Sequence, residues 1–263
     1  MTGIVTAAAI VGGVGIIIGL FLGIAGEKLK VNVNEKEVAV RAELPGNNCG
    51  GCGYAGCDGL AAAIAKGEAP VNGCPVGGAA VGQKIAAIMG VEASESVPMA
   101  AYVKCSGNCD VAKNEYRYSG VPDCRFAALV PDGGAKSCAY GCLGFGSCVK
   151  ACNFGAIKVV NGVAAVDKYA CKACGKCVEA CPKHLIELRP VKGTANVTCS
   201  SHEKGKAVMD ACGVGCIGCS LCEKQCESGA ITMENNLPVI DYIKCTGCGK
   251  CAEKCPKKII YLA

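Results

Sequence analysis

Several common kinds of functional site are absent from this sequence. No GxGxxG motif follows a predicted strand, and the chain has neither a GxxxxGK[ST] phosphate loop nor a nucleophile elbow. Tryptophan does not occur, and the two histidines, His184 and His202, are not expected to be metal ligands. The net charge of +5 comes without a recognition helix or stacking aromatics, which argues against nucleic-acid binding. The sequence therefore predicts no catalytic residues on this chain.

Charged side chains are also absent from the start of the chain, where Glu27 is the first. The apolar stretch from Ile4 to Ala25 matches the roughly 20 residues of a membrane-spanning helix. A cleavable signal would have basic residues before a shorter apolar core, so a membrane anchor is predicted. The chain is therefore expected to be single-pass in the cell inner or plasma membrane. Because Lys28 and Lys30 follow this stretch, the N-terminus would lie outside and the bulk of the chain on the cytoplasmic side.

Cysteine is abundant, with 25 among 263 residues. A disulfide framework is not favoured, because the cysteines lie close together in sequence and no cleavable signal precedes them. The run Cys171-x2-Cys174-x2-Cys177-x3-Cys181-Pro182 is typical of bacterial iron–sulfur proteins. Three thiolates on one tight loop bind one [4Fe-4S] cluster, and the fourth belongs to a neighbouring cluster. Structural zinc, which prefers two separated C-x2-C pairs, fits this triple run less well.

The C-terminal half of the chain is an internal repeat with an offset of 74 residues. Eight cysteines of the first copy correspond to eight of the second: Cys138, Cys142, Cys148, Cys152, Cys171, Cys174, Cys177 and Cys181 match Cys212, Cys216, Cys222, Cys226, Cys245, Cys248, Cys251 and Cys255. Each copy is therefore predicted to be a two-cluster ferredoxin unit. Hairpin turns are expected at Asn161-Gly162 and Asn235-Asn236.

The crossed-ligand rule predicts which cysteines share a cluster. It assigns three complete sets: Cys216, Cys219, Cys222 and Cys255; Cys245, Cys248, Cys251 and Cys226; and Cys171, Cys174, Cys177 and Cys152. The remaining site of the first unit has only Cys142, Cys148 and Cys181, because Phe145 replaces the counterpart of Cys219. That site is either a [3Fe-4S] cluster or takes a fourth thiolate from elsewhere, with Cys138 as the nearest candidate.

A further site is predicted upstream, where Cys49-x2-Cys52-x4-Cys57-x16-Cys74-Pro75 begins in a glycine-rich loop. Glycines let the backbone close around a cluster and direct N–H groups at its sulfurs. A helical stretch is expected from Asp58 to Ala65, between the third and fourth cysteines. A single [4Fe-4S] cluster is favoured here, and a zinc site is the alternative.

Five cysteines keep no assigned role: Cys105, Cys109, Cys124, Cys199 and Cys212. Cys105, Cys109 and Cys124 could form an additional four-thiolate site with Cys138, which would raise the expected number of clusters from five to six. The alternative is that several are buried free thiols that pack as small hydrophobic groups. The segments Val103-Lys-Cys-Ser and Val197-Thr-Cys-Ser are interpreted as related strand ends.

The predicted fold class is α+β, with one transmembrane helix, a small cysteine-rich [4Fe-4S] domain and two tandem ferredoxin units. The expected segments are an anchor (1–26), a linker (27–44), the 4Fe-4S domain (45–90), a cysteine-containing connecting segment (91–137), ferredoxin unit 1 (138–190), a linker (191–211) and ferredoxin unit 2 (212–263). Lysines flank the cysteine loops and would attract an acidic partner: Lys172, Lys176, Lys183, Lys244, Lys250, Lys254, Lys257 and Lys258.

The whole arrangement resembles the B subunit of Rnf electron-transport complexes. The resemblance rests on the order of the membrane helix, the Cys49/Cys52/Cys57/Cys74 motif and the ferredoxin repeats. It implies an iron–sulfur subunit of a membrane-bound ferredoxin:NAD oxidoreductase that is coupled to Na⁺ or H⁺ translocation. Such a subunit would accept electrons from reduced ferredoxin and pass them toward the membrane and flavin-bearing subunits of the complex. The alternative is a membrane-tethered polyferredoxin that serves another reductase or a hydrogenase.

Overall fold

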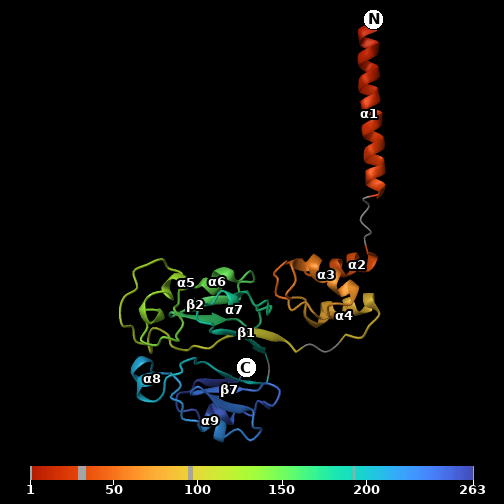
Figure 1. Cartoon of the computed structure of the whole chain (residues 1–263). Coiled ribbons are helices and arrows are strands. Elements are labelled where there is room, and N and C mark those ends of the chain that lie inside the picture. The colour runs from red at the N-terminus through yellow and green to blue at the C-terminus, as the bar shows by residue number, and fades with distance from the viewer. Residues whose placement is uncertain (1, 29–33, 94–96, 192, 263) are drawn as a thin grey trace.

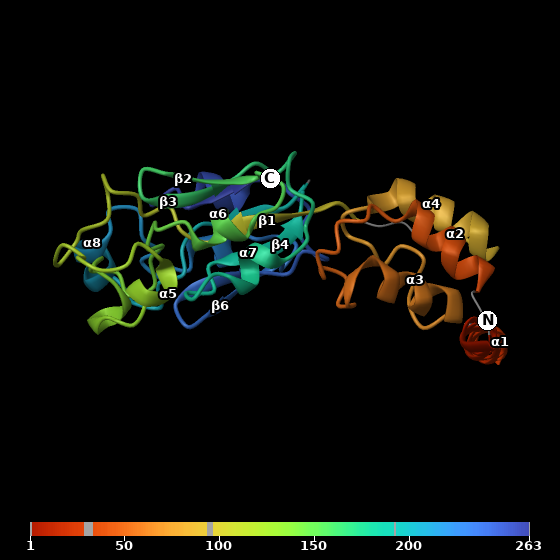
Figure 2. The same ribbon diagram turned by 90° about the horizontal axis from the view of Figure 1, so that it is seen from above.

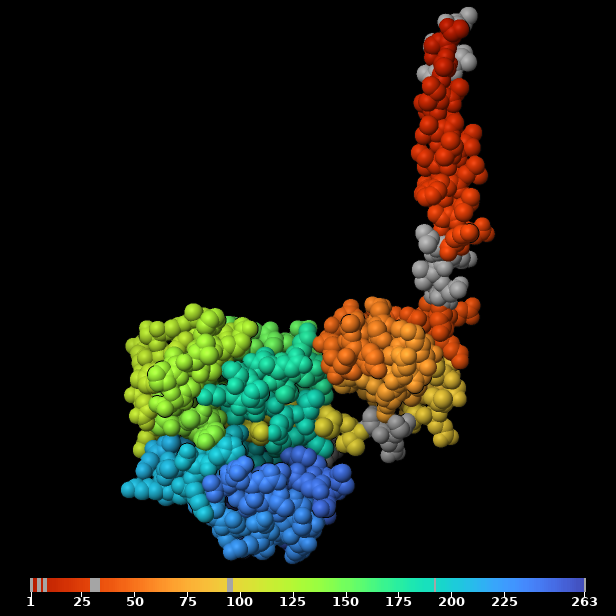
Figure 3. All heavy atoms as spheres, viewed as in Figure 1, coloured from red at the N-terminus to blue at the C-terminus, as the bar shows by residue number. Residues whose placement is uncertain are grey.

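The structure is a computed structural model that describes residues 2–28, 34–93, 97–191 and 193–262. The apolar N-terminal stretch forms one long helix, α1 (Thr2–Lys28), which extends away from the rest of the molecule (Figures 1 and 3). Its segment Ala9–Lys28 has a mean hydropathy of 2.4, and none of it is buried against the rest of the molecule. By length and composition this helix can cross a membrane, as predicted, since apolar side chains exposed on all sides suit a lipid environment.

Three helices form the domain that follows the anchor: α2 (Glu35–Glu43), α3 (Gly56–Lys66) and α4 (Gly78–Met89). Helix α2 begins after Asn34, whose side chain accepts a hydrogen bond of 3.0 Å from the backbone N–H of Lys36. The buried core contains Val40, Leu60 and Ile85, one from each helix. Helix α3 covers the stretch predicted to be helical between the third and fourth cysteines.

Ferredoxin unit 1 contains two antiparallel strand pairs. The outer pair joins β1 (Met99–Val103) to β4 (Ile186–Pro190), and the inner pair joins β2 (Ile157–Val160) to β3 (Val163–Val166). Two short helices lie between the strands, α6 (Ser147–Ala151) and α7 (Lys176–Glu179). The predicted hairpin turn is confirmed, because Asn161 and Gly162 both have positive φ between the paired strands.

Ferredoxin unit 2 repeats this topology. Strand β5 (Ala195–Val197) pairs with β8 (Ile260–Leu262), and β6 (Ile231–Glu234) pairs with β7 (Leu237–Ile240) across a turn formed by two positive-φ asparagines. Its short helices are α9 (Leu221–Lys224) and α10 (Lys250–Glu253). Strands β1 and β5 come from the segments expected to be connectors, so each unit begins with a strand N-terminal to its predicted start. These strands carry no cysteine and are too short to give a clear periodic signal.

The connecting segment packs on both units and contains α5 (Cys124–Ala127) and the short 3₁₀ turn η1 (Pro131–Gly133). Ala112 forms an isolated β-bridge with Cys212, next to α8 (Lys206–Ala211). Tyr118 packs its ring on Phe145 of unit 1, with 5.1 Å between ring centroids. Figure 2 shows α5 and α8 at the end of the molecule opposite the N-terminal domain.

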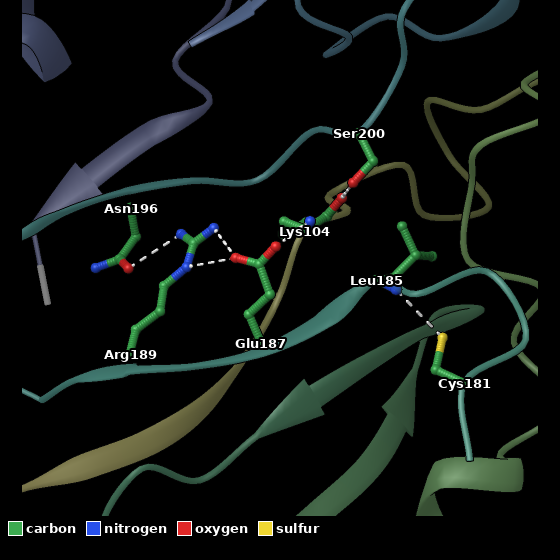
Figure 4. A network of polar contacts seen from close by, with 7 residues as sticks. All are labelled: Lys104, Cys181, Leu185, Glu187, Arg189, Asn196 and Ser200. Atoms are coloured by element: carbon green, nitrogen blue, oxygen red, sulfur yellow. Dashed lines mark hydrogen bonds and ion pairs between the residues drawn. The ribbon is translucent and has the colours of Figure 1, made fainter. Parts of the chain in front are cut away.

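A buried polar network joins the two units (Figure 4). The Arg189 guanidinium of β4 donates hydrogen bonds to Asn196 of β5 (3.2 Å) and to Glu187 (2.8 Å), and Lys104 also donates to Glu187. Arg189 is 6% exposed and Asn196 is fully buried. Burial alone would raise the pKa of Glu187, but the hydrogen bonds from Lys104 and Arg189 hold that pKa below its ordinary value. Glu187 is therefore ionised at neutral pH and compensates the buried charge of Arg189.

Glu187→Gln should destabilise the fold at pH 7 by about 1 to 2 kcal/mol, because a buried guanidinium loses its charged partner on a half-exposed side chain. A lower thermal midpoint by circular dichroism under anaerobic conditions would show this. Because the folded-state pKa of Glu187 is depressed, its contribution is complete above the ordinary carboxyl pKa and is lost as the pH falls below about 4. The exposed Glu179, which has no ion pair among the described residues, supplies the matched control Glu179→Gln. An equal loss of stability in the two variants would contradict the assigned role of Glu187.

Candidate iron–sulfur sites

All 25 cysteines are free thiols, and most lie in the interior or are half-buried. In ferredoxin unit 2, the cavity beneath α9 is lined by Cys216, Cys219, Cys222 and Cys255, the first set expected from the crossed-ligand rule. Three members of the second expected set pack in the same core: Cys226, Cys245 and Cys251. The fourth member, Cys248, is exposed. Burial raises the pKa of Cys251, and negative charge on Cys245 or Cys248 raises it further.

Unit 1 also brings its predicted residues together. One cavity is lined by Cys152, Cys171, Cys174 and Cys177. A second cavity is lined by Cys142, Cys148 and Cys181, the set that lacked a fourth member in the sequence.

The connecting segment supplies a fourth thiol to this second cavity, from Cys124 at the start of α5. Its backbone N–H donates a 2.9 Å hydrogen bond to Oγ of Ser147, which precedes Cys148. Phe145, which replaces a cysteine here, instead packs against Tyr118 of the same connecting segment. The candidate that the sequence suggested, Cys138, lines a different cavity. The sequence offered no spacing signal for Cys124, because a distant segment delivers it.

The N-terminal site is formed by a glycine-rich loop and the start of α3. Gly50 and Gly53 have positive φ, and the backbone N–H of Cys57 donates to Oδ1 of Asn48 at 2.8 Å. Cys52, Cys57 and Cys74 pack in the domain core, and Cys49 is half-buried on the same loop. Cys74 Sγ accepts a hydrogen bond of 3.4 Å from the N–H of Gly77. The four cysteines of the motif thus belong to one small domain.

This N-terminal loop lies directly against unit 1. A Cβ added to Gly51 would be 2.6 Å from the carbonyl oxygen of Cys174, so the two cysteine loops touch where no side chain fits. Figures 2 and 3 show the N-terminal domain beside the part of unit 1 that holds α7 and β4. The glycine permits the close approach of two candidate sites.

Backbone N–H groups point at many of the sulfurs. Cys171 Sγ accepts from Ala101 and Ala173 at 3.4 Å each, and Cys226 Sγ accepts from Ala230 at 3.3 Å. Cys181 Sγ accepts from Leu185 at 3.4 Å, as Figure 4 shows. Hydrogen bonds to cluster sulfurs are one means by which proteins set reduction potentials.

Burial strongly affects the ionisation of the interior thiols. It raises the pKa of Cys177 to about 12, and the pKa values of Cys148 and Cys222 to about 11, with neighbouring thiols adding to the effect. These groups are therefore neutral thiols in the metal-free chain, and binding of iron would release their protons.

The donor type and number at these sites suit iron–sulfur clusters. Sets of cysteine thiols line common cavities or pack in one small domain, and cysteine thiolates are the usual ligands of [4Fe-4S] clusters. Within the residues that the structure describes, no group of three or more His, Cys, Asp or Glu side chains is placed to hold a single metal ion. The residues present therefore fit iron–sulfur clusters.

The structure does not bring together the four cysteines of the additional site that the sequence suggested, Cys105, Cys109, Cys124 and Cys138. Cys124 lines the unit 1 cavity already described, whereas Cys105 and Cys138 line another, together with Cys199 and Cys212. Cys109 is exposed and lies beside Gly162 in the β2–β3 turn.

Family models match the cysteine-rich parts of the chain. Residues 44–76 match a model described as a putative Fe-S cluster, residues 164–187 a 4Fe-4S binding domain, and residues 215–259 a 4Fe-4S dicluster domain. [4Fe-4S]-type domains are therefore present in both halves of the chain.

Three relatives align with nearly the whole chain. The B subunit of an ion-translocating oxidoreductase complex from Methanosarcina acetivorans is 43% identical, over 98% of both chains. The B subunit of the Na⁺-translocating ferredoxin:NAD⁺ oxidoreductase complex from Acetobacterium woodii is 45% identical, over 99% of this chain and 78% of the relative. The corresponding protein of the proton-translocating complex from Clostridium ljungdahlii is 43% identical, over 92% and 87%. The chain therefore belongs to the family of B subunits of ion-translocating oxidoreductase complexes.

Proposed function

We propose that this chain is the electron-relay subunit of a membrane-bound, ion-translocating ferredoxin:NAD oxidoreductase. Electrons would pass from reduced ferredoxin through the chain toward membrane subunits of the complex. The observation that carries this proposal is the contact between successive thiol sites, from the exposed Cys248 in unit 2 to the Gly51 loop of the N-terminal domain. The names of the three relatives support the same assignment.

Bound [4Fe-4S] clusters would supply one-electron redox chemistry, and the chain would hold and tune them. Within unit 1, Cys148 and Cys177 belong to different sites but share one buried core. Within unit 2, Cys222 and Cys251 share a core in the same way. The Gly51–Cys174 contact then connects unit 1 to the N-terminal site.

The open end of this series is in unit 2. Cys248 and Cys219 are exposed, and Ile243 beside the Cys245 loop is 97% exposed. Cys174, the repeat counterpart of Cys248, is instead covered by the Gly51 loop. We therefore place the entry of electrons in unit 2 and their exit at the N-terminal domain, next to the membrane helix.

The basic face around this entry differs from the sequence expectation in one respect. Lys250 pairs with Glu227 and Lys244 pairs with Asp241, so part of their charge is compensated. Lys254 and Lys258 are exposed and form no ion pair with a carboxylate among the described residues. These two lysines are the better candidates for steering an acidic ferredoxin.

We also infer that Cys124 is the fourth ligand of the Cys142, Cys148 and Cys181 site, since it lines the same cavity. This assignment makes the site a complete four-thiolate set and removes the need for a three-iron cluster. The orientation proposed for the chain places both ferredoxin units in the cytoplasm, where reduced ferredoxin would reach them.

Reversing the charge of both free lysines, as Lys254→Glu with Lys258→Glu, should slow reduction of the chain by ferredoxin about tenfold at low ionic strength. The effect should nearly vanish at 1 M salt, where the screening length falls to about 3 Å. Anaerobic stopped-flow bleaching of the visible cluster absorbance would measure the rate.

The matched control is Lys36→Glu with Lys66→Glu, which changes the charge equally at the opposite end of the chain. Equal slowing by both pairs would place docking elsewhere. In membrane vesicles, added ferredoxin should reduce the chain only when the cytoplasmic face is outward. A chain that ferredoxin does not reduce under any of these conditions would overturn the proposed function.

Cys124→Ala should leave three thiolates at its site and convert a [4Fe-4S] cluster into a three-iron cluster. The oxidised variant should then show an EPR signal that oxidised wild-type protein lacks, since only the three-iron cluster is paramagnetic in that state. Cys109→Ala, which removes an exposed thiol from the same segment, should remain silent. The same signal in the wild-type protein would favour the three-iron alternative, and silence in both variants would show that Cys124 does not ligate.

Gly51→Ala should separate the N-terminal loop from unit 1, because its Cβ would lie 2.6 Å from the Cys174 carbonyl oxygen. We expect faster hydrogen exchange in the loop around Cys174 and slower electron transfer to the N-terminal site, with the iron content unchanged. Gly59→Ala is the control, since its Cβ would make an ordinary 3.7 Å contact with Tyr54. Unchanged exchange in the Gly51 variant would show that the two loops do not pack together in solution.

A further inference from the structure

We infer that Cys105, Cys138, Cys199 and Cys212 hold an additional [4Fe-4S] cluster, in a bridging site that joins the two ferredoxin units. The four thiols line one cavity of about 210 Å³. Cys105 and Cys138 belong to the unit 1 side of the cavity and Cys199 and Cys212 to the unit 2 side. The electron-relay role of this bridging site rests on the proposed function, whereas its occupancy can be tested independently.

The bridging site has internal symmetry that follows the sequence repeat. Cys138 and Cys212 are repeat counterparts, and each begins the same turn. The N–H of Gly141 donates to the Cys138 carbonyl at 3.1 Å, and the N–H of Gly215 donates to the Cys212 carbonyl at 3.3 Å. Each unit thus contributes an equivalent thiol just before its first predicted cluster motif.

The other two thiols follow the first strand of each unit. Cys105 comes after β1 and Cys199 after β5, as the related strand ends in the sequence suggested. These strand ends bind one another, because the Ser106 N–H donates to the Thr198 carbonyl at 3.1 Å and Ser200 Oγ donates to the Lys104 carbonyl at 3.0 Å. The reciprocal contacts hold Cys105 and Cys199 at the junction between the units.

The absence of a side chain at Gly107 leaves room for sulfurs from both units at this site. A Cβ added to Gly107 would lie 3.2 Å from Cys212 Sγ and 3.7 Å from Cys105 Sγ.

Hydrogen bonds connect this site to the sites on either side. Cys105 Sγ accepts from the N–H of Cys142 at 3.4 Å, and Cys199 Sγ accepts from the N–H of Cys216 at 3.3 Å. Cys142 and Cys216 are themselves predicted ligands of the neighbouring clusters. The bridging site therefore contacts unit 1 and unit 2 through the same pair of equivalent residues.

A buried cation at the cavity supports a negatively charged occupant. Lys136 is 8% exposed, and its Nζ donates to the carbonyls of Gly107 at 2.7 Å and Gly162 at 3.4 Å. No carboxylate in the described part of the chain pairs with it. A lysine buried without a counter-ion is unfavourable. Four thiolates around a cluster carry net negative charge and would supply the missing compensation.

The cavity has room for an occupant larger than a single metal ion. One water-sized group needs only about 10 to 15 Å³, far less than the cavity's volume of about 210 Å³. A cubane ligated by four cysteines fits this space and the number and type of the donors.

In the proposed relay, one electron would enter this site from the Cys216 side and leave on the Cys142 side. The unit 2 site is oxidised by one electron and the unit 1 site is reduced by one, with no bond formed or broken and no proton transferred. The two units would then form one conducting series.

The test is iron, acid-labile sulfide and zinc per chain on anaerobically purified full-length protein. Six four-iron sites predict about 24 irons and as many sulfides. Cys199→Ala leaves three thiolates, so it should contain about 23 irons with the oxidised-state EPR signal of a three-iron cluster, or about 20 irons where the whole cluster is lost. Cys109→Ala, which removes the one cysteine outside the six sets, should keep about 24 irons and show no such signal. The EPR spectrum of the dithionite-reduced Cys199 variant should also narrow, because the neighbouring clusters lose a magnetic coupling partner.

Cys105→Ser is a second variant that keeps the test valid if the alanine variant does not fold, since the serine hydroxyl can still ligate iron. It should retain about 24 irons with an altered reduced-state EPR spectrum. About 20 irons in both wild type and Cys199→Ala, or an unchanged spectrum in Cys105→Ser, would overturn the bridging cluster and leave the proposed function standing. A single zinc lost in Cys199→Ala would also overturn it. Little iron in any of these proteins would instead refute the proposed function itself.

Discussion

Four sulfurs must meet around each cluster, and this requirement determines most of the structure. The strands of both ferredoxin units are three to five residues long, and the core of each unit combines cysteines with a small number of aliphatic side chains. So small a core would give little stability by apolar burial alone. Metal ligation can contribute the missing free energy, because sites that form only in the folded state couple binding to folding. The buried thiols, whose pKa values rise to about 11 or 12, are in that sense suited to ligation rather than to existence as free acids.

Duplication produced two similar units that are not used in the same way. Unit 1 has Phe145 in place of a cysteine, and the connecting segment covers that position with Tyr118 and adds Cys124 to the cavity. The opposite side of unit 1 is covered by the Gly51 loop. Unit 2 keeps its full cysteine motif and exposes Cys219 and Cys248. Contacts on two sides suit unit 1 to an internal position in a series, and an open edge suits unit 2 to a mobile partner.

The sequence predicted the parts of this arrangement that depend on local spacing. The cysteine runs, the helix after Cys57 and the asparagine turns of the two hairpins each have a signal within a few residues, and the helix and the turns appear as expected. The role of Cys124 had no such signal, because its partners lie 18 to 57 residues away on another element. The ends of strands β1 and β5 were expected from the matching segments at Val103 and Val197, but their place in the two units was not. Each joins its unit by pairing with that unit's last strand, a contact that spans most of the unit and leaves no local signal.

The same distinction explains why the junction between the units is hard to recognise from sequence. Its four cysteines are separated by 33, 61 and 13 residues, a spacing that matches no iron–sulfur motif. Only the fold shows that two pairs of equivalent positions face each other, with a buried lysine beside them. A duplicated ferredoxin without this junction would be two separate electron carriers on one chain. The contacts between the strand ends, and the polar network of Arg189, Glu187 and Asn196 behind them, hold the units at one fixed separation. Electron transfer through a protein depends on such fixed separations, so a rigid junction is needed for the repeat to act as one path.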